Sequence, residues 1–202
     1  MKSSTCLMVA ILLIICSCRE SVDQIDNLSY DSVLMNALVQ EMHCTLISEN
    51  EKINLGLQVL DIDTDSVVTL RELSENEKIL FFFYSNFQCG ECVDRELKFI
   101  KELYQDNTVI ILAKENGKRN LAIVRKTKAI HQKMYLMNRE DSLNMSMEDL
   151  SRPIFFRINK LGQPYNLYSP KFSYPQFSKL YHTIMAKQIG QNWPSGDIPL
   201  VR

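Results

Sequence analysis

Two cysteines separated by two residues carry the clearest chemical signal in the sequence. Cys89-Gly-Glu-Cys92 brings two thiols within one helical turn of each other. The thiolate is the nucleophile of disulfide exchange, and a second thiol three residues on can attack the mixed disulfide that the first one forms. The spacing therefore predicts redox exchange, with Cys89 as the attacking cysteine and Cys92 as the resolving one.

The residues around this pair predict a strand followed at once by a helix. Ile79–Tyr84 is a continuous apolar run, too short for a helix of its own and typical of a buried strand. The first turn of the following helix leaves N–H groups unpaired, and a thiolate at Cys89 would accept from them. Its pKa is then expected to fall below the usual value of about 8.5. The apolar face of the helix is formed by Val93, Leu97, Ile100 and Leu103.

Length and composition fit one globular domain with an extension. The chain has 202 residues, of which 46% are hydrophobic and 23% charged. The formal net charge is −1, which does not suit nucleic-acid binding. We therefore expect no nucleic-acid partner.

Residues 1–17 are predicted to be a lipoprotein signal peptide. Lys2 precedes an apolar segment, Leu7–Ile15, which is shorter than the roughly 18 residues that span a bilayer. Ile15-Cys16-Ser17-Cys18 resembles the lipobox of bacterial lipoproteins, which implies cleavage before Cys18 and lipidation of that residue. An ordinary cleaved signal peptide, with an incidental cysteine at position 18, is the alternative.

Both alternatives predict an exported protein, in a compartment where disulfides persist. We expect it to be extracytoplasmic and anchored to a bacterial membrane through lipid on Cys18, facing the periplasm. Residues 18–52 are then a tether and an N-terminal helix, 53–187 the main domain and 188–202 a C-terminal tail. Cys44, in the N-terminal helix, is interpreted as a small buried apolar residue rather than a third redox thiol.

The remaining elements follow from hydrophobic periodicity and from turn residues. Pro153 stands at the start of one predicted strand, where the missing N–H of proline is tolerated. Pro164 begins another strand, which its missing N–H restricts to an edge of the sheet. Strands are predicted over 56–63, 67–70, 108–113, 133–137, 154–158 and 164–168, and helices over 121–130, 141–150 and 174–187.

The predicted order of elements resembles the thioredoxin fold. Three features add to this resemblance: the CxxC at a strand-to-helix turn, the segment Arg152-Pro153-Ile-Phe-Phe and the turn Asn159-Lys-Leu-Gly162. In these features the chain is similar to the membrane-anchored thiol–disulfide oxidoreductases related to TlpA and ResA, and to the AhpC/TSA group. The resemblance covers roughly Ile53 to Lys187. It implies an α/β fold with a central mixed sheet flanked by helices, extended by an N-terminal helical and β segment.

The resemblance also implies a substrate-facing loop. Pro153 would be cis and would face the CxxC, while Arg152 would offer its backbone to an extended substrate peptide. A trans Pro153 at the start of an edge strand is the alternative. Gln88 occupies the position of the family's aromatic residue before the first cysteine, and it is assigned with Arg152 and Pro153 to substrate binding.

Two departures from the family pattern concern acidic residues. The family's buried acid would fall near Phe83, where this sequence has none. Glu91 instead lies between the cysteines, where a carboxylate is expected to raise the pKa of Cys89 and to shift the pair toward a more reducing potential. Glu91 is also a candidate proton acceptor for Cys92.

The sequence thus predicts an enzyme that reduces protein disulfides without a cofactor or metal, supplied by a thiol electron donor in the membrane or periplasm. Three alternatives stay open. One is a metal carrier using both cysteines and a histidine, with Cu(I) or Zn(II) as the ion. The second is a peroxidase, although the Pro-x-x-x-Thr context before the cysteine is absent. The third is a scaffold lipoprotein whose CxxC only staples its own turn. The histidines are His43, His131 and His182.

Overall fold

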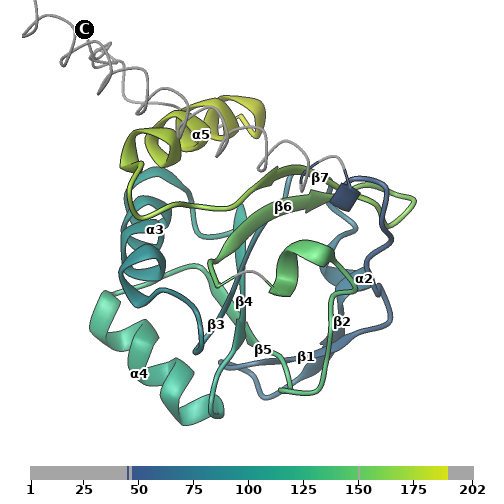
Figure 1. Cartoon of the computed structure of the whole chain (residues 1–202). Coiled ribbons are helices and arrows are strands. Elements are labelled where there is room, and N and C mark those ends of the chain that lie inside the picture. The colour runs from purple at the N-terminus through teal and green to yellow at the C-terminus, as the bar shows by residue number, and fades with distance from the viewer. Residues whose placement is uncertain (1–44, 46, 150, 191–202) are drawn as a thin grey trace, which may run out of the picture. The chain divides into compact units, whose positions relative to one another are not determined.

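A seven-stranded mixed sheet organises residues 45, 47–149 and 151–190, the part of the chain that the computed structural model describes (Figure 1). Strands β3, β4 and β5 are parallel to one another, and every other neighbouring pair is antiparallel. In spatial order the strands are β2 (Val67–Thr69), β1 (Gln58–Asp61), β5 (Lys133–Leu136), β4 (Val109–Lys114), β3 (Leu80–Ser85), β6 (Ile154–Ile158) and β7 (Pro164–Tyr168).

The helices are distributed unequally over the two faces of this sheet (Figure 1). One face is covered by the long helices α3 (Gly90–Leu103), α4 (Lys118–Lys128) and α5 (Pro175–Gln188), whose buried residues share one apolar cluster. The other face is covered by the short helices α2 (Leu70–Leu73) and η1 (Ser146–Asp149) and by the segments that connect the strands.

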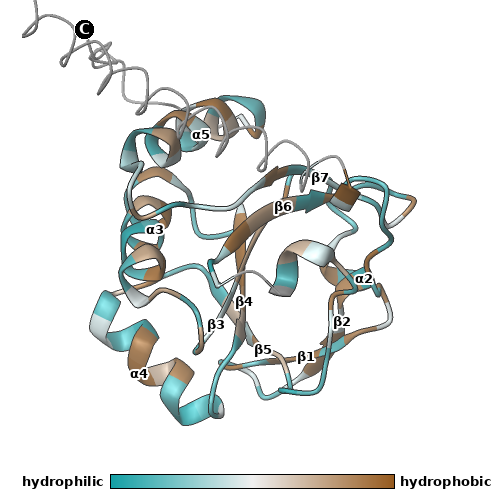
Figure 2. Cartoon of the chain, viewed as in Figure 1, coloured by the Kyte–Doolittle hydropathy of each residue, from teal (hydrophilic) through white to brown (hydrophobic). Residues whose placement is uncertain are grey.

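Strand β3 is apolar on both sides because both faces of the sheet are covered. Phe82 packs toward the helical face and stacks on Phe155, with ring centroids 4.5 Å apart. Phe81 packs toward the opposite face and stacks on Phe156 at 5.5 Å. Figure 2 shows hydrophobic residues along the central strands and both hydrophobic and hydrophilic residues along the helices.

The thioredoxin-like fold class is confirmed. A β3–α3–β4 unit with parallel strands is followed by the antiparallel β6–β7 hairpin and the terminal helix α5. Strand β7, which begins with Pro164, lies at one edge of the sheet as predicted. The predicted β1–β2 hairpin is also present, at the opposite edge.

The prediction of a helix over 141–150 is wrong, because only the single turn η1 forms there. Asn144 has a left-handed backbone, with φ of 62°, which interrupts a right-handed helix. The Glu148 carboxylate accepts hydrogen bonds from Leu143 N at 2.7 Å and from Ser142 Oγ at 2.8 Å, in place of helical carbonyl groups. The two methionines of this segment, Met145 and Met147, are buried in the core.

Several expectations fall on residues outside the described ones. These are the signal peptide, the lipidation of Cys18, most of the N-terminal helix with Cys44, and residues 191–202 of the tail. Among the residues that the structure does describe, no helix combines the length and apolarity that a bilayer crossing requires.

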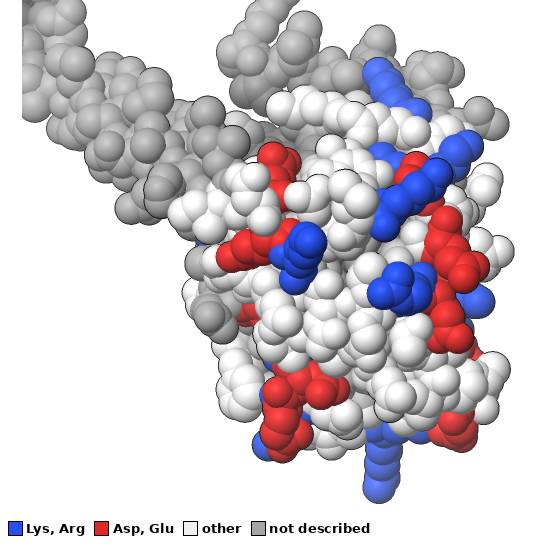
Figure 3. Space-filling view, turned by 90° about the vertical axis from the view of Figure 1, so that its right-hand side faces the viewer, with Lys and Arg blue, Asp and Glu red and all other residues white. Residues whose placement is uncertain are grey.

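Charged side chains of both signs are interspersed on the face shown in Figure 3, with uncharged surface between them. A nucleic-acid-binding face instead gathers lysine and arginine into a stripe or patch. This face therefore offers no electrostatic footprint for nucleic acid.

Candidate active site

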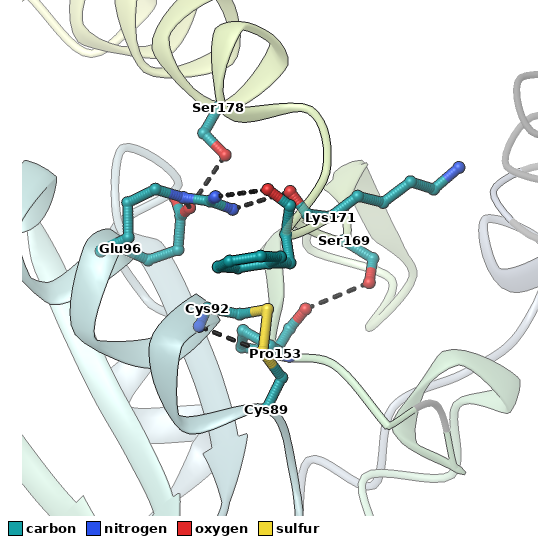
Figure 4. The surroundings of a disulfide bond; sticks show 9 residues. Cys89, Cys92, Glu96, Pro153, Ser169, Lys171 and Ser178 are labelled. Carbon is teal, nitrogen blue, oxygen red and sulfur yellow. Dashed lines mark hydrogen bonds and ion pairs between the residues drawn. A yellow bond between two sulfur atoms is a disulfide. The ribbon is translucent and has the colours of Figure 1, made fainter. Parts of the chain in front are cut away.

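A disulfide joins Cys89 and Cys92 at the start of α3, where the chain leaves strand β3 (Figure 4). Cys89 is the N-cap residue of this helix, and its sulfur accepts a hydrogen bond from Cys92 N at 3.2 Å. A side-chain acceptor at this position satisfies one of the unpaired N–H groups of the first helical turn. After reduction, the same N–H and the helix dipole would favour a thiolate at Cys89.

The two cysteines differ in their exposure to solvent. Cys92 is only 1% exposed, whereas Cys89 is partly exposed. A protein disulfide can approach a sulfur atom only where that atom reaches the surface, so this difference suits an attacking Cys89 and a resolving Cys92. Those two roles stay predictions.

The loop before β6 lies against the disulfide, as Figure 4 shows for Pro153. Cys89 N donates a hydrogen bond to Ser151 O at 3.1 Å, which holds this loop to the start of α3. The carbonyl of Pro153 accepts from Ser169 Oγ at 3.2 Å, and Ser169 is fully buried. The structure therefore brings Arg152 and Pro153 to the CxxC.

The prediction of a cis bond before Pro153 is wrong, since the described part of the chain contains no cis peptide bond. A trans bond is the more stable isomer of an X–Pro bond by about 0.5–1 kcal/mol. Contact between the loop and the CxxC is made through the Ser151 carbonyl, one residue before Arg152, and this contact does not require a cis bond.

The other two predicted site residues lie on either side of Cys89. Gln88 accepts a hydrogen bond from Ser85 N at 3.0 Å through its side-chain oxygen, and this bond closes the turn between β3 and α3. Glu91 is exposed in the first turn of α3, where a carboxylate interacts favourably with the helix dipole. Both residues are thus placed at the CxxC turn, and their functional roles stay predictions.

A buried acid that the sequence reasoning missed lies one turn beyond Cys92. Phe83 is apolar and 1% exposed, so the family's acid is indeed absent there. Glu96, on α3, is fully buried, and its carboxylate accepts from Ser178 Oγ at 2.8 Å and from Arg95 Nε at 3.0 Å. Its position could have been noticed, because a charged residue on the apolar face between Val93 and Ile100 departs from the amphipathic pattern.

Glu96 is paired with a fully buried histidine of α5. His182 Nε2 lies 2.9 Å from Glu96 Oε2, and His182 Nδ1 lies 2.8 Å from the Tyr104 hydroxyl. Burial lowers the pKa of His182, and the hydrogen bond and charge of Glu96 oppose this effect only in part. The imidazole is therefore neutral, with Nε2–H donating to Glu96 and Nδ1 accepting from Tyr104.

The neutral, buried state of His182 predicts that the protein loses stability in mild acid. Between the lowered native pKa and the unfolded value of about 6.5, only the unfolded imidazole binds a proton. The unfolded state therefore binds more protons, and the free energy of unfolding decreases as the pH falls below about 6.5, by at most about 1.4 kcal/mol per pH unit. Urea unfolding between pH 7.5 and 5 measures this slope. His182→Phe should flatten it, and an unchanged slope in that variant would contradict the assignment.

Arg95 connects the buried pair to the loop that precedes α5. Its guanidinium donates to the carbonyl oxygens of Lys171 at 2.9 Å and of Phe172 at 3.2 Å, while its Nε binds Glu96 (Figure 4). Charge-assisted hydrogen bonds of this kind fix geometry as well as adding stability. The loop that carries Ser169 and Lys171 is thereby fastened beside the disulfide.

No cluster of three metal-ligating side chains occurs among the described residues. His182 is engaged by Glu96 and Tyr104 through its two ring nitrogens, and His131 is exposed on the loop after α4. Neither histidine joins the two cysteines in a ligand set. His43, the third histidine of the metal alternative, lies outside the described residues.

No family model and no curated protein matches the sequence. The comparison with solved structures does return matches. A proposed protein disulfide isomerase from Bacteroides thetaiotaomicron is 17% identical, with 67% of this chain and 91% of that chain covered and a TM-score of 0.48. An uncharacterised thioredoxin-like protein from Porphyromonas gingivalis is 18% identical, with 71% and 97% covered and a TM-score of 0.47. A thiol:disulfide interchange protein from Bacteroides sp. is 11% identical, with 67% of this chain and 89% of that chain covered and a TM-score of 0.46.

Each of these likenesses concerns the fold, and none transfers an activity to this chain. The class that the molecule itself defines is a thioredoxin-like α/β protein with a disulfide at the start of the helix that follows β3.

Proposed function

We propose that the protein is a thiol–disulfide oxidoreductase that reduces disulfides of partner proteins through Cys89 and Cys92. The observation that carries this proposal is the asymmetric disulfide at the N-terminus of α3. Cys89 is partly exposed and its sulfur accepts from a helix N–H, while Cys92 is buried. A disulfide that only stapled its own turn would require neither the exposed cysteine nor the loop of Pro153 beside it.

The proposed reaction moves two electrons in two exchange steps. The Cys89 thiolate attacks one sulfur of the partner disulfide, forms a mixed disulfide and releases the partner's other sulfur as a thiolate. The Cys92 thiolate then attacks Cys89 Sγ, which forms the Cys89–Cys92 disulfide and releases the partner's second thiolate. The released thiolates take up protons. A thiol electron donor returns two electrons to the Cys89–Cys92 pair and is itself oxidised to a disulfide.

Glu91 supports reduction rather than oxidation as the direction of exchange. Its carboxylate, in the same helical turn as Cys89, opposes formation of a thiolate and so makes the pair more reducing. Arg152 and Pro153 are proposed to hold an extended peptide of the partner beside the sulfur atoms, with Gln88 at the rim of the site. The hydrogen bond between Cys89 N and Ser151 O supports this arrangement, because it fixes the loop at the sulfur.

An extracytoplasmic location is part of the proposal. It is supported by the apolar segment near the N-terminus and by the lipobox-like residues before Cys18. Lipid on Cys18 would keep the domain at a bacterial membrane, where a membrane or periplasmic thiol donor could reach it. In that setting the partner proteins would be other exported proteins that carry disulfides.

The reduction potential of the pair tests this function. We expect a value between about −120 and −270 mV, the range of catalytic dithiols, together with turnover of a protein disulfide such as that of insulin. Equilibration in dithiothreitol or glutathione buffers, followed by alkylation and mass measurement, gives the potential. Turnover should persist in the presence of a chelator. A potential below about −300 mV with no turnover would instead indicate a structural staple.

A further inference from the structure

A cavity of about 240 Å³ lies directly beside the CxxC turn, on the side of helix α4. It is lined by the end of β3, by Gln88 and Gly90 on either side of Cys89, and by residues of α3 and α4. Figure 1 shows these two helices next to each other on one face of the sheet. Of the residues assigned to the exchange site, Gln88 lines this cavity, whereas Cys89, Cys92 and the loop of Pro153 do not.

A buried hydroxyl group without a partner belongs to the lining of this cavity. Tyr84, the penultimate residue of β3, is only 3% exposed, and its hydroxyl has no hydrogen-bond partner among the described residues. Leaving such a group unpaired costs about 1–3 kcal/mol, and buried polar groups in native proteins are rarely unpaired. A ligand that enters the cavity can supply the missing partner.

The charges around the cavity are predominantly negative. Asp94 and Glu115 both line it. Asp94 has a cationic partner, Lys128, at 2.6 Å, whereas Glu115 has none among the residues that the structure describes. Burial raises the pKa of the Glu115 carboxyl group, and burial together with the charges of Glu115 and Asp94 raises the pKa of the Tyr84 hydroxyl. Two carboxylates and one ammonium group thus surround an unpaired hydroxyl, and a second cation would balance them.

The remaining walls and the volume restrict what this cation can be. Val93, Leu97 and Val124 give the cavity apolar sides, which suit an aliphatic stem that carries a charge at its end. Pockets for whole small molecules usually measure about 300–1,000 Å³, so a cavity of about 240 Å³ suits one long side chain better. Cys89 lies between Gln88 and Gly90 in the sequence, and these two neighbours both line the cavity.

We propose that this cavity binds a lysine or arginine side chain of the partner protein, close to the cysteine that exchanges with Cys89. The proposal rests on the proposed function and specifies its substrates as disulfides with a basic residue nearby. The cationic end group would lie between Glu115 and Tyr84, with its methylene groups against the apolar walls. Selection would then act mainly on binding, because no reacting atom is involved.

The preference for a basic residue is tested with a set of disulfide-bonded peptides that each contain one cysteine and differ only at one position near it. Lysine, arginine, norleucine or glutamate is placed in turn at each of the three positions before and after the cysteine. At one position we expect lysine and arginine to raise kcat/KM about tenfold over norleucine, as one charge-assisted hydrogen bond would. The gain should come mainly from KM, and glutamate should lower kcat/KM.

Two variants of residues that line the cavity are expected to lose the preference that the wild-type protein shows. Glu115→Gln and Tyr84→Phe should remove the preference for lysine and arginine, while reduction of the norleucine peptide stays unchanged. Tyr84→Phe deletes only an unpaired hydroxyl, so it should leave stability intact. Glu102→Gln is the matched control, because Glu102 is half-exposed on α3 and does not line the cavity. The control should retain the full preference.

The outcomes separate this inference from the proposed function. Equal reduction of all peptides by the wild-type protein would overturn the inference and leave the oxidoreductase function standing. Reduction of none of the peptides would count against the oxidoreductase function, and the inference is then decided by binding. Amide NMR of the oxidised protein titrated with the lysine peptide should show shifts at Gly90, Val124 and Lys128 that Glu115→Gln abolishes, and their absence would overturn it.

Discussion

Cys92→Ser is expected to trap the protein in a mixed disulfide with its partner. The serine hydroxyl cannot replace the Cys92 thiolate, so the bond between Cys89 and the partner's cysteine would persist. Incubation of the reduced variant with a protein disulfide should yield a covalent one-to-one complex on non-reducing gels. Dithiothreitol should dissolve this complex, and turnover should fall to background.

Cys89→Ser should abolish the activity without forming such a complex. The remaining cysteine, Cys92, is only 1% exposed, so a protein disulfide cannot reach its sulfur. Cys44→Ser provides the matched control, since Cys44 is predicted to be an apolar packing residue, and it should trap nothing and keep full turnover. Normal turnover by Cys92→Ser would show that the two roles are wrongly assigned.

The sequence was sufficient to locate the CxxC turn because its determinants are local. The apolar run of β3 signals a strand that is covered on both faces, since alternation disappears when both faces are buried. The helix after the cysteines follows from its own apolar periodicity. Pro153 and Pro164 mark strand positions through their missing N–H groups, and the structure places them at the start of the β6 segment and on the edge strand β7.

One local signal was overlooked in the segment after β2. Thr69-Leu-Arg-Glu72 has the sequence pattern of a capping box, although hydrophobic periodicity predicts a strand over residues 67–70. The structure forms the short helix α2 there, with Glu72 N donating to Thr69 Oγ1 at 3.3 Å and Thr69 N donating to the Glu72 carboxylate at 2.6 Å. Helix α2 has only four residues, which is too few for hydrophobic periodicity to indicate a helix. The capping box was therefore the signal from which this helix could be predicted.

Features that depend on distant parts of the chain could not be predicted. Glu96 and His182 are 86 residues apart, and nothing in the spacing of either residue indicates the other. The placement of three long helices on a single face depends on how the β4–α4–β5 connection packs, which hydrophobic periodicity does not determine.

His182→Ala is expected to cause the largest loss of stability among single changes near the site. The substitution removes the partner of Glu96 Oε2 and of the Tyr104 hydroxyl, in a region with no access to water. Leaving a buried hydrogen-bonding group without its partner costs about 1–3 kcal/mol, and more where the group is charged. We expect about 3 kcal/mol, because the Glu96 carboxylate and the Tyr104 hydroxyl both lose a partner, while Arg95 and Ser178 still bind the other oxygen of the carboxylate.

Thermal and urea unfolding measure this loss, which corresponds to a Tm lower by about 6–12 °C for a chain of this size. Glu102→Gln is the control, because its ion pair with Lys98 is exposed and 4.0 Å long, and such pairs contribute at most about 1 kcal/mol. Combining Glu96→Leu with His182→Phe should recover part of the loss, because an apolar pair leaves no buried carboxylate without a partner, while the Tyr104 hydroxyl still loses His182 Nδ1. If His182→Ala were no less stable than Glu102→Gln, the buried pair would not hold α3 to α5. The fastening of the loop beside the disulfide through Arg95 would then require another explanation.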